Sequence, residues 1–593
     1  MNEELKDRLK RRIFAAGGKK KAELVLKNAS IINVFTESVM KADIAIEDGY
    51  IVGTGRYEGE KEVDLKGSYV CSGFIDGHIH LESSMVLPAE FERAVLPHGT
   101  TAVVTDPHEI TNVAGAAGID YMFQKTKDLC MDVFFMLPSC VPSTDLDESG
   151  ARMSADDLAP FYMEPRVLGL AEMMNSYGTV QGDRECLEKI RKALEAGKII
   201  DGHAPFLSGK ALQAYASAGV TSDHECSNLE EAFEKLACGQ WIMIRQGTAA
   251  HNLEALIDLF KPPFYQRVML VTDDKHPGDL LHGGHIDGII RQAVEMGADP
   301  VRAIKMGTFN PACFFGLKNR GAVAPGYIAD LVIFENVNTM KVTAVYKGGK
   351  LAAENGRLAA ESLPVAGRSH EKGPDAKNQE TTDKVFHSFH LPPVTVSDLK
   401  LKEHGSRQRV IDLVARELTT RERILEWREH PGFAPGVDIR QDIVKLAVFE
   451  RHHNTGHRGL GFLGRYGLKR GAVATSIGHD SHNLVIAGVT DADMMAAGNR
   501  VIENQGGLAL ALDGKVLADL PLPVAGLMSV LTLEETEKRL EELKVISRRL
   551  GISDDIDPFM TLAFVSLPVI PKLRLNTYGI IDVEMQKVVE AVY

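Results

Sequence analysis

The sequence lacks the features that mark secreted and membrane proteins. Its seven cysteines include no C-x-x-C pair, and no apolar run reaches the roughly 18 residues that a membrane-spanning helix needs. The first residues, MNEELKDRLKRR, contain no apolar segment of the kind found in secretion signals. We therefore expect a cytoplasmic protein with reduced cysteines and no membrane partner.

Positive charge is also scarce. The 593 residues include 67 Lys and Arg against 81 Asp and Glu, which gives a formal net charge of −14. A net acidic chain repels nucleic acid, so we expect no nucleic-acid partner. One basic run, Lys19–Lys21, lies near the N-terminus, and we interpret residues 1–22 as a solvated helical and basic tail.

Two stretches that are far apart in the sequence have the alternation typical of β-strands. Residues 23–72 alternate apolar and polar side chains and contain the turn signal Asp48-Gly49, and residues 317–360 show the same pattern. We predict that these stretches form one small β-sandwich domain, which is split around the residues between them.

The residues between these stretches, 73–316, alternate apolar runs with amphipathic helical segments. Eight runs read as strands: SYVCSGFIDGHIH (68–80), TAVVTD (101–106), DVFFMLPS (132–139), VLGLAEM (167–173), KIIDGHAP (198–205), GVTSDHE (219–225), WIMIRQG (241–247) and RVMLVTDD (267–274). This alternation indicates a parallel sheet buried on both faces, and eight units suit a closed (β/α)₈ barrel. An open doubly wound sheet is the alternative, but no Gly-rich dinucleotide loop follows the first strand. The predicted fold class is therefore α/β, with a TIM-like barrel.

The last third of the chain follows a change in composition. Residues 361–385 are polar and contain Pro and Gly, so we predict a linker there. Residues 386–593 mix strand patterns with helical ones, such as LTLEETEKRLEELKVISRRLG (531–551). We predict a separate C-terminal α+β domain.

Polar residues stand at the ends of the predicted strands, where barrels of this type have their active sites. They are His78, His80, Asp106, His108, Glu172, His203, His224, Asp273 and Asp274. A two-residue repeat points His78 and His80 to the same side of their strand, about 6–7 Å apart. Imidazoles and carboxylates without cysteine suit Zn²⁺, Fe²⁺ or Mn²⁺, and Glu172 is suited to bridge two ions. His203 or His224 alone would more often be a structural residue than a ligand, and the His78–His80 pair alone would favour neither interpretation, so the prediction rests on their joint placement.

The motifs GFIDGHIHLESS, TDPHEITNVAG, VTDDKHPGDLL and IGHDSHNLV resemble the amidohydrolase superfamily, and within it the adenine deaminases of bacteria and archaea. The resemblance covers nearly the whole chain. It implies hydrolysis of adenine to hypoxanthine and ammonia by a metal-activated hydroxide, a reaction of purine salvage or catabolism. The implied cofactor is a pair of divalent transition-metal ions, Fe²⁺ or Mn²⁺, with Zn²⁺ as a further option. The chain has no P-C-x-x-C segment of the other zinc deaminases.

The resemblance also implies roles for individual residues. The first metal would be held by His78 and His80, the second by His203 and His224, and Glu172 would bridge them. Asp273 would be both a metal ligand and the proton shuttle, and a one-residue shift in register would give that role to Asp274. We therefore treat Asp273, Glu172, Asp274 and His224 as candidate catalytic residues.

The substrate would lie among residues just past the strands. We predict substrate contacts from Glu82, Ser83, His108, Glu109 and His482. The ring nitrogen beside C6 must gain a proton, and Glu82, Glu109 or a non-bridging Glu172 could supply it. In the C-terminal domain, RHHNTGHRGLGFLGRYG (451–467) and TSIGHDSHNLV (475–485) are rich in Gly and His. They could cover the barrel mouth, bind a further ion through His479, Asp480 and His482, or form a structural loop network or subunit contact.

Two other classes of function stay open. Another amidohydrolase, such as a cytosine or guanine deaminase, a cyclic amidase or an amino-sugar deacetylase, would share the same strand-end residues. A barrel without catalytic activity would be expected to have lost ligands, and none is missing here. Size suggests a homodimer or larger homo-oligomer, with adenine and water as the small-molecule partners.

Overall fold

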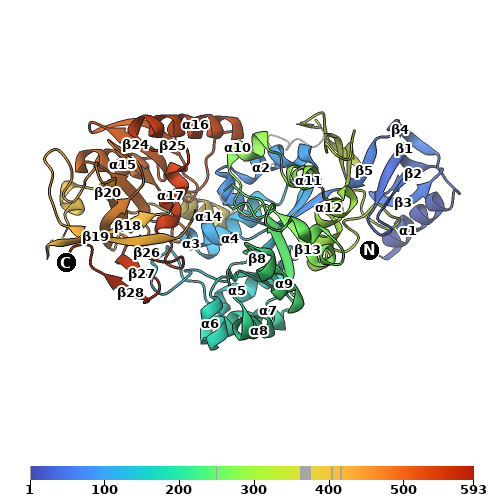
Figure 1. Cartoon of the computed structure of the whole chain (residues 1–593). Helices are drawn as coiled ribbons and strands as arrows, with labels where there is room; N and C mark the ends of the chain where they lie inside the picture. Colours follow the sequence, from blue (N-terminus) through green and yellow to red (C-terminus); the bar gives the residue numbers. More distant parts are fainter. Residues whose placement is uncertain (1, 249, 361–375, 402–404, 415–416) are drawn as a thin grey trace.

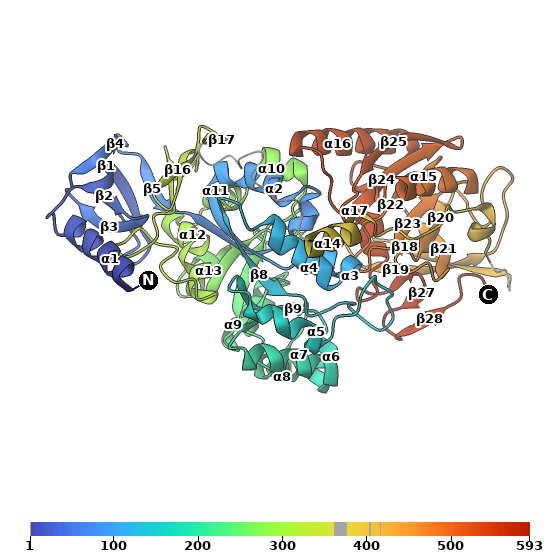
Figure 2. The same cartoon turned by 180° about the vertical axis from the view of Figure 1, so that it is seen from behind.

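The computed structural model describes residues 2–593 except 249, 361–375, 402–404 and 415–416. Figures 1 and 2 show three parts in a row: a small sheet domain at the N-terminal end, a central α/β part and a C-terminal domain. Among the described residues, no helix is both long enough and apolar enough to cross a membrane.

The small domain is one nine-stranded sheet built from two segments of the chain. Its strands are β1 (Ala22–Asn33), β2 (Ser38–Glu47), β3 (Tyr50–Gly55), β4 (Gly59–Asp64), β5 (Tyr69–Ser72), β14 (Leu331–Phe334), β15 (Val342–Lys347), β16 (Lys350–Glu354) and β17 (Arg357–Leu358). The two segments meet where β5 pairs antiparallel with β14. We predicted a sandwich of two sheets, but this pairing joins the strands into a continuous hydrogen-bonded sheet.

The N-terminal residues are tied to this sheet. Helix α1 (Asn2–Ala16) places Ala15 in a buried cluster with Val25 and Ala45. Lys20 Nζ lies 2.5 Å from Oε1 of the buried Glu47. The prediction of a solvated tail is therefore wrong for this residue, because its charge is paired with a buried acid.

The central part contains eight parallel strands in two sheets, of five and three strands. They are β6 (Phe74–Ile79), β7 (Thr100–Thr105), β8 (Asp132–Leu137), β9 (Val167–Met173) and β10 (Ile199–Gly202), followed by β11 (Ser222–Asp223), β12 (Trp241–Arg245) and β13 (Val268–Val271). Thr221 N donates to Ile200 O at 3.0 Å, and Asp273 N donates to His78 O at 2.9 Å. These bonds connect the sheets on both sides and give a TIM-like barrel. The predicted first run, residues 68–80, divides between β5 of the small sheet and β6 of the barrel.

The interior of the barrel is filled by apolar side chains from six strands. They are Ile75, Ala102, Val104, Met136, Ala171, Met243, Met269 and Val271. Other side chains of the same strands, such as Val103 and Phe135, pack outward into a second cluster that includes residues of the surrounding helices. Burial on both faces explains why these strands are continuously apolar in sequence.

Helices and short helical turns connect the strands. They are α2 (Pro88–Val95), α3 (His108–Ala114), α4 (Ala116–Lys125), α5 (Ala155–Leu158), α6 (Ser176–Gln181), α7 (Arg184–Glu195), α8 (Gly209–Ser217), α9 (Leu229–Ala237), α10 (Pro277–His282), α11 (Ile286–Glu295), α12 (Pro300–Met306) and α13 (Phe309–Phe314). Helix α7 shows why they form: Asp183 caps its first N–H groups, and Cys186, Ile190 and Ala193 place one apolar stripe in the core.

The predicted linker is wrong over its described part. Residues 361–375 lie outside the described residues, but helix α14 (Ala376–Phe386) follows them and packs beside α4. Val385 is buried in the same cluster as Tyr121 and Met122 of α4. The polar composition hid this helix, because Thr381 and Val385 are its buried side chains among the described residues 379–386.

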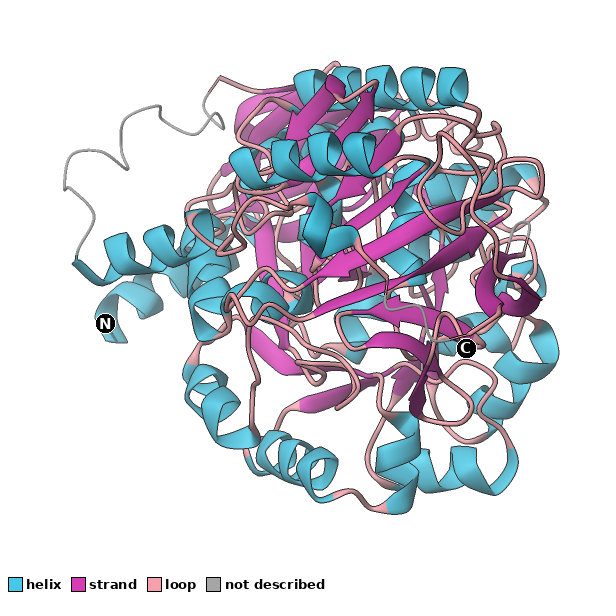
Figure 3. Cartoon of the chain, turned by 90° about the vertical axis from the view of Figure 1, so that its left-hand side faces the viewer, coloured by secondary structure: helices cyan, strands magenta, loops and turns pink. Residues whose placement is uncertain are grey.

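The C-terminal domain is built on an eight-stranded sheet in the order β19-β18-β21-β20-β23-β22-β24-β25. Its strands are β18 (Arg407–Leu413), β19 (Thr420–Glu426), β20 (Ile443–Phe449), β21 (Arg458–Gly464), β22 (Ala472–Thr475), β23 (Leu484–Gly488), β24 (Gly507–Leu512) and β25 (Lys515–Pro521). Helices α15 (Asp491–Glu503), α16 (Leu533–Leu550) and α17 (Pro558–Val565) accompany it, and β26 (Leu573–Asn576), β27 (Gly579–Asp582) and β28 (Lys587–Val589) form a small sheet. Seen from this domain, the strands lie in the interior with helices outside them (Figure 3).

Candidate functional site

His78 and His80, at the end of the first barrel strand β6, face Asp273, which lies just past the end of the eighth strand, β13. Nε2 of His78 and Nε2 of His80 lie 3.4 and 3.1 Å from Oδ1 of Asp273. Asp273 has a φ of 61°, an uncommon left-handed conformation for a residue other than glycine. Such backbone conformations cluster at functional sites. The Oδ1 atom of Asp274 accepts a hydrogen bond from Ser83 Oγ at 2.5 Å, and Asp274 also places a carboxylate oxygen within 4.8 Å of donor atoms of His80 and Asp273.

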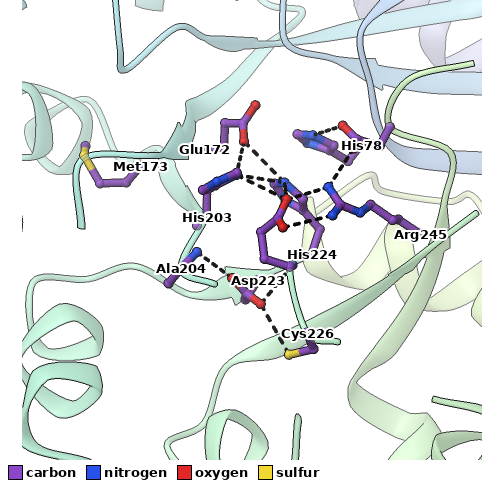
Figure 4. A network of polar contacts seen from close by, with 12 residues as sticks. His78, Glu172, Met173, His203, Ala204, Asp223, His224, Cys226 and Arg245 are labelled. Atoms are coloured by element: carbon purple, nitrogen blue, oxygen red, sulfur yellow. Dashed lines mark hydrogen bonds and ion pairs between the residues drawn. The ribbon is translucent and has the colours of Figure 1, made fainter. Parts of the chain in front are cut away.

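Glu172, at the end of β9, lies at the centre of the cluster. Its Oε1 is 3.4 Å from His80 Nε2, while its Oε2 is 2.8 Å from His203 Nδ1 and 3.3 Å from His224 Nε2. Figure 4 shows this carboxylate beside His203 and His224, with His78 nearby. Each oxygen of Glu172 therefore faces a different set of imidazoles.

The donor atoms of this cluster fit divalent metal ions. His78 Nε2 and His224 Nδ1 are buried and have no hydrogen-bond partner among the described residues. Glu172, His203 and His224 place one donor atom each within 4.8 Å of one another, as do His78, His224 and Asp273. His78 Nε2, which faces Asp273, is therefore available to an ion, and imidazole with carboxylate suits Zn²⁺, Fe²⁺ and Mn²⁺.

The acids of the cluster are ionised. Burial alone would raise the pKa of Asp273, but the neighbouring His78, His80 and Arg245 outweigh it and hold the pKa well below its usual value. For Glu172, burial is likewise outweighed by hydrogen bonds from His203 and His224, and its pKa is well below the usual value. A deprotonated carboxylate is the form that binds metal.

Three residues at this cluster escaped the sequence-based reasoning. Arg245 Nη1 lies 2.9 Å from Asp273 Oδ2 and 2.5 Å from Glu225 Oε1, and Asp201 Oδ2 lies 3.3 Å from His78 Nδ1. A signal was present, because Arg245 closes β12 and Glu225 directly follows His224. Arg245 holds Asp273 on the side opposite its histidines.

His108 connects this cluster to a second carboxylate. Its Nδ1 lies 3.0 Å from Asp106 Oδ2 and 3.5 Å from Glu172 Oε1, while its Nε2 lies 3.5 Å from Glu109 Oε1. The ring therefore stands between Glu172 and Glu109. His108, which we predicted as a substrate contact, does not line the cavity described next.

A small cavity of about 20 Å³ lies between the barrel mouth and the C-terminal domain. It is lined by Glu82, Ser83, Met85, Glu109, Asp274 and His276 from the barrel, and by Ile477, His479, His482, Leu527 and Met560 from the C-terminal domain. Four of the five predicted substrate contacts are on its wall. The apolar members, which include Leu527 and Met560, have no pattern in the sequence that distinguishes them from core residues.

Glu82 and Glu109 differ in how they face this cavity. Glu82 accepts a hydrogen bond at Oε1 from Ile110 N, 3.2 Å away, and its Oε2 has no partner among the described residues. Burial raises its pKa to about 7. Glu109 contacts His479 Nδ1 through Oε1, at 2.8 Å, and His482 Nε2 through Oε2. Burial alone would raise the pKa of Glu109, but the neighbouring imidazoles of His479 and His482 outweigh it and hold the pKa well below its usual value.

Comparison with known proteins places the chain in a family. The "Adenine deaminase C-terminal domain" family matches residues 417–587, and the "Amidohydrolase family" matches residues 69–352. The chain is 46% identical to "Adenine deaminase 2" of Carboxydothermus hydrogenoformans, over 97% of this chain and 98% of that protein. It is 44% identical to the "Adenine deaminase" of Kosmotoga olearia, over 96% of both.

Among solved structures, a β-aspartyl dipeptidase from Fervidobacterium islandicum AW-1 is similar at 18% identity, with a TM-score of 0.43, over 57% of this chain and 98% of that one. The level of identity to full-length relatives decides the assignment. The chain belongs to the adenine deaminase family of the amidohydrolases.

Proposed function

We propose that this protein hydrolyses adenine to hypoxanthine and ammonia. The observation that carries the proposal is the 46% identity, over nearly the full length of both chains, to a protein named adenine deaminase. The cluster around Glu172 supports it, because hydrolysis of an aromatic amine needs an activated water and a group that moves protons.

Two divalent ions would be held at this cluster. His78, His80 and Asp273 would bind one, and His203 and His224 the other, with Glu172 shared by the two sites. The donor set suits Fe²⁺ or Mn²⁺, and also Zn²⁺. When bound, such ions lower the pKa of water and make a nucleophile available at neutral pH.

Asp273 would move the protons on the nucleophile's side of the reaction. It is ionised, so it can take the proton that the attacking water loses and pass it to the departing amine. Arg245, at 2.9 Å from Oδ2, keeps the side chain in one orientation while Oδ1 faces the two histidines. Asp274 is engaged by Ser83 and belongs to the cavity wall.

Glu82 is the best-placed acid for the ring nitrogen beside C6. It is buried, it lines the cavity, and its Oε2 is uncommitted among the described residues. Both oxygens of Glu109 contact imidazoles. Because an acid must present a proton to the substrate, an uncommitted oxygen favours Glu82 for this step.

An ammonia assay tests the function. The purified protein would be reconstituted separately with Fe²⁺, Mn²⁺ and Zn²⁺ and given adenine, adenosine, cytosine and guanine. We expect ammonia from adenine, with hypoxanthine as the second product. Ammonia from cytosine or guanine but not from adenine, or none from any substrate with two metal equivalents bound, would contradict the proposal. A cytoplasmic location and a homodimeric or larger assembly stay predictions.

A further inference from the structure

One loop of the C-terminal domain reaches into the barrel mouth. Residues 476–483, between β22 and β23, place His479 and His482 on the carboxylate of Glu109, which stands in the first turn of α3. Both histidines are buried, at 6% and 1% exposure. His482 has a φ of 53°, so its backbone is held in a strained conformation at this contact.

The loop is held in place by two buried side chains of the C-terminal domain, Arg451 and His452. Arg451 donates from Nη2 to Ala525 O at 2.8 Å and from Nε to His482 O. His452 Nε2 lies 2.7 Å from Ser481 O. Arg451 and His452 thus support the loop that contacts Glu109, and the position of that loop is set by the C-terminal domain.

The hydrogen bonds of His482 define which of its two ring nitrogens carries the proton. Gly478 N donates to Nδ1 at 3.3 Å, so this nitrogen is an acceptor and the proton of the neutral ring is on Nε2. Nε2–H then donates to Oε2 of Glu109. Burial lowers the pKa of His482, which agrees with a neutral ring.

His479 supplies the positive charge that pairs with the carboxylate of Glu109. Its ring is stacked on Phe564 at 4.7 Å between centroids, and its Nδ1 lies 2.8 Å from Oε1 of Glu109. Burial would lower the pKa of His479, but Glu109 outweighs it and raises the pKa to about 9. Glu109 is therefore an ionised carboxylate held between an imidazolium and a neutral N–H donor.

An ionised carboxylate on a cavity wall can only accept hydrogen bonds. It therefore selects a ligand that carries an N–H group. Neutral adenine has one N–H on its five-membered ring, whereas adenosine and 9-methyladenine have none there. The cavity is close to the metal cluster, since Glu82 and Asp274 follow His80 and Asp273 by two and one positions.

We propose that His479 and His482 are positioning residues that hold Glu109 as the acceptor for the ring N–H of a free purine base. The C-terminal domain then takes part in substrate selection and disfavours bases substituted at that nitrogen. This inference rests on the proposed function, because it assigns the proposed substrate to this cavity.

The same three side chains have a second reading as ligands of a further ion, since their donor atoms lie within 4.8 Å of one another. A ligating Nε2 must have lost its proton. Gly478 N–H holds the tautomer of His482 in which Nε2 keeps it. The hydrogen-bonded arrangement is therefore favoured, and metal content becomes one arm of the test.

The experiment compares His482→Leu, which removes the donor, with His482→Gln, which keeps an N–H group at similar reach. His457→Gln is the matched control, because His457 pairs with Glu148 (2.9 Å) without lining the cavity. Adenine binding is measured by calorimetry, turnover by ammonia release, and the Ki of 9-methyladenine by competition.

For His482→Leu we expect about 10- to 100-fold weaker adenine binding and a matching rise in KM, because a hydrogen bond to a charged group is lost. The Ki of 9-methyladenine and kcat should change less than threefold. His482→Gln should restore most of the affinity, and His457→Gln should match wild type.

Three results would overturn the inference. One is an equal loss of affinity for adenine and 9-methyladenine. Another is a loss in kcat alone with KM unchanged. The third is a metal ion beyond the two of the barrel that disappears in His482→Leu. If 9-methyladenine binds too weakly to measure, the KM and kcat values and the rescue by Gln still decide. Adenine that binds the wild type but releases no ammonia would contradict the proposed function and leave this binding test valid.

Discussion

Two buried carboxylates in this protein are each surrounded by imidazoles, yet they are built for different chemistry. Around Glu172 the rings come from neighbouring strand ends of one barrel, and buried nitrogens such as His224 Nδ1 have no partner among the described residues. Around Glu109 two of the rings come from the C-terminal domain, and Nδ1 of His482 already accepts from Gly478 N.

The two clusters differ in whether the ring nitrogens of their histidines already have a hydrogen-bond partner. Several imidazoles and carboxylates that gather their donor atoms around unsatisfied nitrogens can hold a metal ion, whereas a histidine whose other nitrogen already accepts a hydrogen bond is a fixed donor. His108 touches both carboxylates, so the two regions are in contact but distinct. The comparison predicts that metal content depends on Glu172 and ligand affinity on Glu109.

The largest expected effect comes from Glu172→Gln. An amide cannot bridge two ions as a carboxylate does, so we expect metal content to fall from two equivalents to one or fewer and kcat/KM to drop about 1000-fold or more. Metal analysis and ammonia release measure this. Glu109→Gln is the matched control and should keep two equivalents. Two ions in Glu172→Gln, or a loss of metal in Glu109→Gln, would contradict the distinction.

The cluster around Glu172 could be predicted from the sequence, because the position of a residue at a strand end is visible in the local sequence pattern. His78, His80, His203 and Asp273 each follow an apolar run, and the ends of parallel strands meet at one rim. The convergence seen in the structure follows from that rule. The roles of the individual residues still rest on the resemblance to the family.

The cluster around Glu109 could be predicted only in part from the sequence. Glu109 and His482 were both expected near the substrate, but they stand 373 positions apart and meet only because one domain docks on another. No periodicity encodes that contact. The same limit applies to α14, whose polar sequence hides the contact of Val385 with α4, and to Leu527 and Met560, which resemble any core residue.

A smaller loss of activity is expected when Glu82 is replaced, since this acid belongs to neither cluster of histidines. Glu82→Gln keeps the shape of the cavity wall but removes the proton donor, so we expect kcat to fall about 100- to 1000-fold with KM and metal content nearly unchanged. Steady-state kinetics and metal analysis measure this. A Glu82→Gln enzyme with full kcat would remove Glu82 from the mechanism and return the role of ring acid to Glu109.

The smallest effect concerns a buried acid with no imidazole at all, which shows what the rings do for the other two. Glu92 accepts from Met131 N at 2.6 Å, and its Oε2 has no hydrogen-bond partner among the described residues. Burial raises its pKa to about 7, against the lowering effect of backbone hydrogen bonds from Met131 and Cys130. The folded protein therefore binds this proton more tightly than the unfolded chain.

The stability that Glu92 contributes is complete below its ordinary pKa and is lost as the pH rises through about 7. Glu92→Gln, which is neutral at every pH, should unfold at a higher temperature than wild type at pH 8, by the equivalent of about 3 kcal/mol, and at nearly the same temperature at about pH 4. Thermal unfolding at the two pH values measures the difference. Equal Tm values at pH 8 would mean that Glu92 is ionised without cost, and that burial alone does not distinguish it from the carboxylates held by histidines.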